Sequence, residues 1–211
     1  MVAAVLFDLD NTLYAPERDL FALIDKRINR YMLEVVAIPR AEVDGLRRHY
    51  WKAYGATLQG LIRHYGVDPE DYLDYVHDVD VSTRLQPDPL LCSSLQRLPL
   101  RRFVFTNGSR GHAERVLAAL GLAESFEEIF DIRIANYQPK PNPDPYHGVL
   151  RQLGLAAGHC VMVEDSLANL ATAKQLGMTT VLVAQDPEQS AVVDHQVATA
   201  SQAAQLVTSW L

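Results

Sequence analysis

The sequence is short of cysteine and of positive charge. Its 211 residues include only two cysteines, Cys92 and Cys160, which lie far apart and have no metal-ligand spacing. Such usage is typical of a reducing compartment, so we expect a cytoplasmic protein without disulfide bonds. The formal net charge is −7. Because nucleic-acid polymers and anionic membranes usually bind proteins with a surplus of lysine and arginine, this charge argues against both as partners.

Long apolar runs are absent as well. The segment VAAVLF follows Met1 without the basic residues of a signal peptide, and it reaches Asp8 long before it could cross a bilayer. We therefore expect neither a signal peptide nor a membrane span. We also find no internal repeat and no low-complexity tract. The composition, 48% hydrophobic and 21% charged, is that of an ordinary globular protein with a sizeable core.

The sequence does contain an alternation of short apolar runs and longer helical patterns. The runs are rich in valine, isoleucine and phenylalanine, and the alternation is typical of a parallel sheet covered by helices. It predicts an α/β fold with a doubly wound, Rossmann-like parallel sheet. The expected core strands are residues 2–9, 102–106, 132–135, 160–163 and 180–183. Beyond about residue 186 we expect a final edge element and a closing helix.

The interval between the first two expected strands is unusually long. It spans roughly ninety residues, where a crossover connection needs about a dozen. Helical patterns fill it, at residues 42–54, 58–65 and 69–77 and, before these, at Leu20, Ile24, Ile28, Tyr31 and Val35. Helices without a strand among them predict a small helical cap, residues 15–85, inserted into a core made of residues 1–14 and 86–211.

Polar residues punctuate the ends of the expected strands. They are Asp8, Asp10, Thr106, Asn107, Lys140, Glu164 and Asp165. Taken singly, each pattern has a common structural role: a surface lysine, a helix cap or an acidic helix start. However, the carboxyl ends of parallel strands meet at one edge of a doubly wound sheet, where ligands bind. We therefore expect these residues to converge on one site.

The residue types at this site indicate phosphate chemistry. Asp8 and Asp10 lie two apart and can reach the same pocket, and Glu164 with Asp165 adds further carboxylates. A hard divalent cation would offset this crowding, and Mg²⁺ is preferred over Zn²⁺ because no cysteine or histidine joins the group. A site with Mg²⁺, Lys140 and a hydroxyl suits the oxygens of a phosphate. The pattern predicts phosphoryl transfer.

The motifs FDLDNTLY, VFTNGS, KPNPDPY and VMVEDSLANLATAKQLGMTTVLV, in this order, resemble the haloacid dehalogenase-like hydrolase superfamily over nearly the whole chain. More narrowly, YGATLQGLIRHYG and TNGSRGHAERVLAALGL resemble its pyrimidine 5′-nucleotidase branch, which has a helical cap. The resemblance implies a Mg²⁺-dependent phosphatase of small phosphate monoesters, with pyrimidine nucleoside 5′-monophosphates such as UMP and CMP as expected substrates.

The resemblance also implies roles for the residues that match its motifs. Asp8 would be the nucleophile that forms an aspartyl-phosphate, and Asp10 the acid and base of the two half-reactions. To act as an acid, Asp10 needs a raised pKa, which burial and its acidic neighbours would favour. Thr106 would bind phosphate through its hydroxyl and Asn107 through its backbone N–H. Lys140 would bind the phosphate as well and offset the charge of the aspartate and the phosphate.

The same resemblance implies a ligand set for the metal. Asp8, the carbonyl of Asp10 and Asp165 would hold Mg²⁺ directly, and Glu164 would stand behind them. The order of Glu164 and Asp165 remains open at this stage. Thr12 would orient Asp10 or cap the turn.

Several alternatives are weighed against this reading. Dehalogenases of the superfamily lack an acid at the position of Asp10, so Asp10 argues against their chemistry. A phosphatase or phosphomutase of sugar phosphates keeps both aspartates and stays open. A receiver-like phosphoacceptor domain, which is not an enzyme, is much shorter and has no inserted helices.

Substrate choice is expected to lie in the helical insertion, because the core motifs contact only what all phosphate monoesters share. Within YGATLQG, Gly55 breaks the helical pattern and Thr57 and Gln59 offer polar groups to a base or ribose. His112, at the start of a helix, is as readily a surface residue as one that faces the site. The sequence leaves a monomer and a homodimer equally open.

Overall fold

A single parallel sheet forms the centre of the computed structural model, which describes all 211 residues. Its six strands have the order β3-β2-β1-β4-β5-β6, and all neighbours are parallel. The strands are β1 (Ala4–Phe7), β2 (Arg101–Phe105), β3 (Glu128–Phe130), β4 (Cys160–Glu164), β5 (Thr179–Val183) and β6 (His195–Val197). The chain winds outward from β1 in both directions, so the order reverses between β1 and β4. The doubly wound sheet predicted from the sequence is confirmed.

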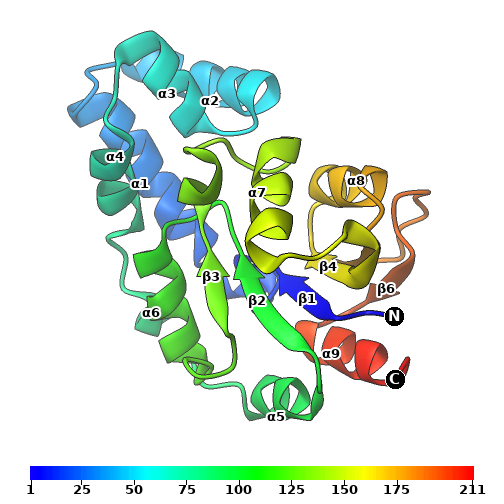
Figure 1. Ribbon diagram of the computed structural model, residues 1–211. Coiled ribbons are helices and arrows are strands. Elements are labelled where there is room, and N and C mark those ends of the chain that lie inside the picture. Colours follow the sequence, from blue (N-terminus) through cyan, green and yellow to red (C-terminus); the bar gives the residue numbers. More distant parts are fainter.

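Helices cover both faces of the sheet (Figure 1). The helices are α5 (Pro89–Arg97), α6 (Arg110–Leu120), α7 (Pro143–Leu153), α8 (Leu167–Gln175) and α9 (Ala200–Thr208). Val5 and Phe7 of β1 face a cluster that includes residues of α5, α6 and α9, whereas Ala4 and Leu6 face one that includes residues of α7 and α8. A strand buried on both faces needs an unbroken apolar run, which explains the composition of β1. None of the helices combines the length and the apolar composition that a membrane span requires.

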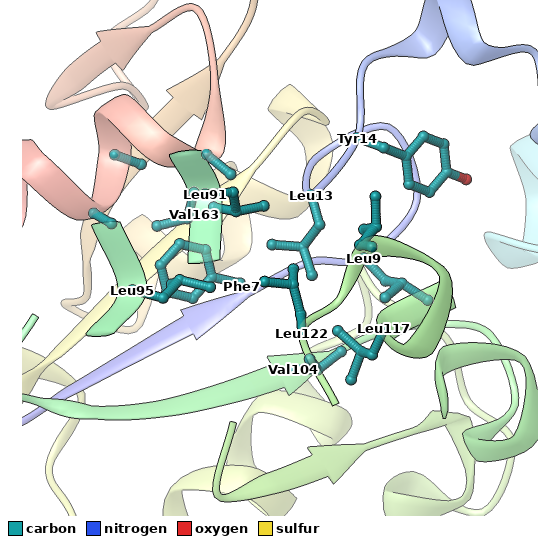
Figure 2. Close-up of a cluster of buried hydrophobic side chains, with 14 of the residues drawn as sticks. Phe7, Leu9, Leu13, Tyr14, Leu91, Leu95, Val104, Leu117, Leu122 and Val163 are labelled. Atoms are coloured by element: carbon teal, nitrogen blue, oxygen red, sulfur yellow. The ribbon is translucent and has the colours of Figure 1, made fainter. Parts of the chain in front are cut away.

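The first apolar cluster continues past the end of β1 and supports the loop that follows. Figure 2 shows Phe7, Leu9 and Leu13 among leucines and valines of neighbouring elements. Because side chains alternate along an extended chain, the burial of Phe7 and Leu9 leaves Asp8 on the other side, and a turn begins at Asp10. The packing of this cluster thereby fixes the backbone from which the side chains of Asp8 and Asp10 extend.

The long interval after β1 is helical throughout, as expected. It contains η1 (Pro16–Arg18), α1 (Phe21–Glu34), α2 (Arg40–Tyr54), α3 (Thr57–Tyr65), α4 (Pro69–His77) and η2 (Val81–Thr83). Helices α1 to α4 pack around an apolar cluster of their own, with Tyr31, Met32 and Leu61 at most 2% exposed. Figure 1 shows them grouped to one side of the sheet.

One expected strand is wrong. Residues 132–135 form a short 3₁₀ helix, η3 (Ile132–Ala135), and the third strand is β3, immediately before it. The Asp131 side chain accepts a hydrogen bond from the Arg133 backbone N–H, which favours a helical turn over an extended chain. Ile132 packs into the apolar cluster of the insertion. The apolar pattern that suggested a strand thus reflects a helical turn docked on the insertion.

The insertion depends on a close contact at Gly60, where helix α3 meets Tyr50 of α2. A Cβ atom at Gly60 would lie 2.0 Å from Cγ of Tyr50, which is 3% exposed. We expect Gly60→Ala to lower the free energy of unfolding by about 1–3 kcal/mol, because overpacking a dense core outweighs the better helix propensity of alanine.

Gly45→Ala is the matched control, because Gly45 lies in helix α2 and nothing approaches its Cβ position within 4 Å. Urea titration of both variants measures the free energy of unfolding, and Gly45→Ala should leave this free energy unchanged or raise it. Equal effects of the two substitutions would contradict this account of the packing.

Candidate active site

The loops at the carboxyl ends of the strands bring a lysine between two carboxylates. Lys140 Nζ lies 2.8 Å from Oδ1 of Asp8 and 2.8 Å from Oε2 of Glu164. It also donates to the carbonyl oxygen of Phe105 at 2.7 Å. Lys140 and Glu164 are each 1% exposed and Asp8 is 7% exposed. The buried ammonium therefore connects the ends of β1, β2 and β4.

These contacts use all three N–H groups of the Lys140 ammonium. Burial lowers the pKa of this ammonium, but the charges of Asp8 and Glu164 raise it by more, so the pKa lies above its ordinary value. Lys140 is therefore a cation that holds Asp8 and Glu164 in place, with no remaining N–H for another ligand in this arrangement.

The loop that carries Lys140 is held by its backbone. The Asn107 side chain accepts a hydrogen bond from the Lys140 backbone N–H at 2.7 Å and donates to the Lys140 carbonyl oxygen at 3.0 Å. On the side of the insertion, a Cβ atom at Gly55 would lie 3.3 Å from Pro139 Cγ. Gly55 has a φ of 81°, which a glycine adopts without strain. The turn between α2 and α3 thus rests directly on this loop.

A group of carboxylates lies beside the lysine. Oxygen atoms of Asp8, Glu164 and Asp165 all fall within 4.8 Å of one another. Burial and the charge of Glu164 raise the pKa of Asp8 to about 7, although Lys140 acts in the opposite direction. Burial also raises the pKa of Glu164 to about 7, again against Lys140. One ammonium does not fully compensate these acids, so the group is suited to a hard divalent cation.

The two members of the acidic pair after β4 differ in their contacts. Oε1 of Glu164 accepts hydrogen bonds from the backbone N–H groups of Asp165 and Ser166, and Oε2 accepts from Lys140. The half-buried Asp165 carboxylate contacts only its neighbour Glu164 and its own backbone N–H, and no residue from another strand end donates to it. Asp165 is consequently the member of the pair whose oxygens are free for a ligand.

Thr106 and Asn107 follow β2 at the same edge of the sheet. The Thr106 Oγ1 atom accepts a hydrogen bond from the Gly108 backbone N–H at 2.9 Å, which leaves its hydroxyl proton free to donate. Because the Asn107 side chain is occupied with Lys140, its backbone N–H is the group available to a ligand. Both residues are where the sequence places them, and both retain a donor.

Asp10 has partners that the sequence did not assign. Its Oδ1 accepts hydrogen bonds from Tyr14 Oη at 2.6 Å and from His112 Nε2, 2.9 Å away. The Thr12 hydroxyl, expected to orient Asp10 or cap the turn, is buried without a hydrogen-bond partner. Tyr14, rather than Thr12, binds the Asp10 carboxylate, because its longer side chain reaches back to it from the loop.

The expected rise in the pKa of Asp10 is also wrong. Burial raises this pKa, but the charge of His112 and the hydrogen bonds from His112 and Tyr14 lower it by more, so it lies below its ordinary value. The carboxylate form is therefore favoured before a substrate binds. His112 is fully buried, so of the two positions that the sequence left open for it the surface position is excluded.

The polar residues of the YGATLQG segment lie in the interior. Thr57 is 8% exposed and Gln59 is 4% exposed. The Gln59 side-chain amide donates to the carbonyl oxygen of Tyr137 at 2.6 Å and accepts from Gln138. Gln59 thus joins the insertion to the chain just before Lys140.

Comparison with known proteins identifies the family. A family model described as haloacid dehalogenase-like hydrolase matches residues 2–177. The chain belongs to this family. Two curated relatives are "Phosphoglycolate phosphatase" from Rhodospirillum rubrum, 30% identical over 87% of this chain and 80% of the relative, and "Phosphate metabolism protein 8" from Saccharomyces cerevisiae, 28% identical over 83% of this chain. The chain spans only 60% of the length of the yeast protein.

Solved structures of haloacid dehalogenase-like hydrolases share the fold. CbbY from Rhodobacter sphaeroides, solved in complex with phosphate, superposes with a TM-score of 0.67 at 23% identity and covers 96% of both chains. Structures of 2-haloacid dehalogenases match as well. At these identities the likeness establishes the sheet with its helical cap, not the reaction.

The cluster of Asp8, Glu164 and Asp165 predicts that this haloacid dehalogenase-like hydrolase binds a divalent cation in a pH-dependent manner. We expect Mg²⁺ to raise the midpoint of thermal unfolding, by an amount equivalent to about 2.7 kcal/mol at a hundredfold excess over its dissociation constant. Protons compete for Asp8 and Glu164, whose pKa values are raised to about 7. The cation-induced shift should therefore grow as pH increases from about 6 to about 8.

Scanning fluorimetry at matched ionic strength checks this expectation. Asp165→Asn should greatly reduce the shift, because it removes the carboxylate that is free for a ligand. Shifts of equal size in the variant and the native protein, or at both pH values, would contradict the assignment.

Proposed function

We propose that the protein is a Mg²⁺-dependent phosphatase that hydrolyses small phosphate monoesters in the cytoplasm through an aspartyl-phosphate on Asp8. The observation that carries the proposal is the placement of Asp8: Lys140 binds its Oδ1 atom, and no protein group donates to Oδ2. A buried carboxylate with one oxygen held and the other free is suited to attack a phosphorus atom.

The proposed reaction has two steps. In the first, Oδ2 of Asp8 forms a bond to phosphorus, the ester P–O bond breaks, and the leaving oxygen takes a proton from Asp10. In the second, Asp10 takes a proton from a water molecule, which attacks phosphorus and breaks the bond to Asp8. Inorganic phosphate leaves, Asp8 is a free carboxylate again, and Asp10 has regained the proton that it gave to the leaving oxygen, a proton first taken from solvent when the substrate binds and returned to solvent afterwards.

The pKa of Asp10 is compatible with both steps. In the free protein Asp10 is favoured as a carboxylate, the form needed for the second step. An arriving phosphate dianion places negative charge beside it and raises its pKa, which favours the protonated form needed for the first step.

The phosphate would be held by the donors that remain free. The Thr106 hydroxyl and the Asn107 backbone N–H are proposed to bind its oxygens, while Lys140 lowers the negative charge of the site without a direct hydrogen bond. Asp165, Asp8 and the Asp10 carbonyl would hold Mg²⁺, with Glu164 bound to Lys140 behind them. The bound cation would reduce the repulsion between the carboxylates and a phosphate dianion.

The alternative reactions have less support. Asp10 argues against dehalogenation, because a halide leaving group needs no proton from a general acid. A receiver-like domain would not explain a helical insertion that packs over the Lys140 loop. A phosphomutase of sugar phosphates uses the same two aspartates and differs only in its acceptor. The relatives named as phosphatases favour water as the acceptor.

The substrate is proposed from the sequence resemblance and from relatives. Pyrimidine nucleoside 5′-monophosphates are the first candidates because the YGATLQG and TNGSRGHAERVLAALGL segments resemble those of pyrimidine 5′-nucleotidases. Relatives named phosphoglycolate phosphatase and glyceraldehyde 3-phosphate phosphatase make small phosphorylated acids and sugars the second. We propose that Thr57 and Gln59 contribute to the choice, Gln59 through the segment at Tyr137 that it binds.

A substrate panel tests this proposal. With Mg²⁺, phosphate release should be faster from UMP and CMP than from purine nucleotides, phosphoglycolate or sugar phosphates. Thr57→Val should change the ratio of kcat/KM between UMP and GMP while hydrolysis of 4-nitrophenyl phosphate stays nearly constant, because the small ester does not reach the insertion.

Asp8→Asn is the control for contaminating phosphatases and should release no phosphate from any ester. Faster turnover of a sugar phosphate than of UMP would overturn the nucleotidase assignment and keep the phosphatase. No release from any monoester would overturn both.

A further inference from the structure

The two hydrogen bonds to Asp10 end on the same oxygen atom. Tyr14 Oη lies 2.6 Å and His112 Nε2 lies 2.9 Å from Oδ1, while Oδ2 receives no hydrogen bond. A carboxylate without such contacts rotates about its terminal torsion between broad minima. Two donors on one oxygen fix the plane of the carboxylate and leave the other oxygen toward the site.

Both donors are themselves held rigidly. The Tyr14 ring belongs to the apolar cluster and is 5% exposed, and Figure 2 shows its hydroxyl pointing away from the labelled leucines. His112 lies in the first turn of α6 and is completely buried. Its backbone N–H donates to the hydroxyl of Ser109, the N-cap of that helix. The two donors therefore reach Asp10 from independent, well-packed elements.

The insertion also contacts this arrangement. His77, the last residue of α4, stacks on His112 with ring centroids 4.6 Å apart and an interplanar angle of 16°. Nδ1 of His77 lies 3.1 Å from the Ser109 hydroxyl, and its carbonyl oxygen accepts a hydrogen bond from Arg115 at 2.7 Å. Helix α6 and its N-cap residue Ser109 thus hold His77 in place, and His77 covers one face of the His112 ring.

We propose that Tyr14 and His112 are positioning residues that clamp Oδ1 of Asp10, so that Oδ2 is the oxygen that exchanges protons with the leaving group and with water, and that His77 supports the clamp from the insertion. This inference rests on the proposed function. It assigns Oδ2 as the Asp10 oxygen that exchanges protons, and it gives the insertion a role in positioning Asp10.

A positioning role for Tyr14 and His112 predicts different effects on turnover from a purely structural role. If Tyr14 and His112 only join α6 to the loop after β1, their loss weakens turnover of every substrate alike. If they aim Oδ2, their loss impairs the steps in which Asp10 moves a proton. An alkyl phosphate needs a proton on its leaving oxygen, whereas 4-nitrophenolate leaves readily without one. The value of kcat/KM reports the first step, in which the leaving group departs.

Variants compared on these two esters test the clamp. We expect His112→Leu and Tyr14→Phe to lower kcat/KM for an alkyl phosphate about 10- to 100-fold, part of the 10²- to 10⁴-fold that a positioned acid contributes. The loss for 4-nitrophenyl phosphate should be about threefold or less. His112→Gln keeps an N–H donor of similar reach and should recover most of the alkyl-ester activity. His77→Ala should show the same selectivity with a smaller loss.

Equal losses on the two esters, or no recovery in His112→Gln, would overturn the positioning role. A second readout does not depend on turnover. In the metal-free protein, the Nε2 proton of His112 should exchange slowly with water and appear in a proton NMR spectrum. This signal should shift in Tyr14→Phe and be lost or exchange rapidly in Asp10→Ala.

The two readouts distinguish failure of the clamp from failure of the proposed function. Slow exchange in a protein that hydrolyses no ester would overturn the function and keep the clamp as a feature of the fold. Rapid exchange of this proton in the unsubstituted protein would overturn the clamp itself.

Discussion

The buried ammonium of Lys140 is the interaction on which the site depends. It joins Asp8 after β1, the Phe105 carbonyl at the end of β2 and Glu164 at the end of β4. Removal of one partner from a buried ion pair costs about 3–5 kcal/mol, because the remaining charge is left uncompensated. The same contact that aligns three strand ends therefore also sets the orientation of Asp8. The Lys140 ammonium thus serves both the fold and the proposed reaction. The neighbouring Asp165 carboxylate is available to bind a metal cation.

The helical insertion reaches this site through contacts on two sides. On one side, Gly55 rests on Pro139 and Gln59 binds the Tyr137 carbonyl, just before Lys140. On the other, His77 stacks on His112, the partner of Asp10. Lys140 and Asp10, which the proposed reaction needs beside Asp8, are thus each linked to the insertion through neighbouring residues. Such an arrangement makes the position of the helices a determinant of the geometry at the sheet edge.

Sequence reasoning predicted the sheet, the insertion and the acidic and basic residues at the strand ends, because each depends on local periodicity and on the topology of parallel sheets. It misplaced the third strand, because an apolar residue such as Ile132 can pack equally well from a helical turn. It did not assign His112 to Asp10, since the inward face of a helix start is decided by tertiary packing. The lowered pKa of Asp10 follows from that contact and was equally inaccessible.

Asp8 is proposed to carry the phosphoryl group during turnover. This role is tested most directly by rapid acid quenching of the enzyme with substrate and Mg²⁺, followed by peptic digestion and mass spectrometry. We expect a peptide that contains Asp8 and is heavier by one phosphoryl group, with a larger yield in Asp10→Asn acting on 4-nitrophenyl phosphate, whose leaving group departs without an acid while the water-dependent step is slowed. Phosphate release at full rate without this modified peptide, or with the phosphoryl group on another residue, would contradict it.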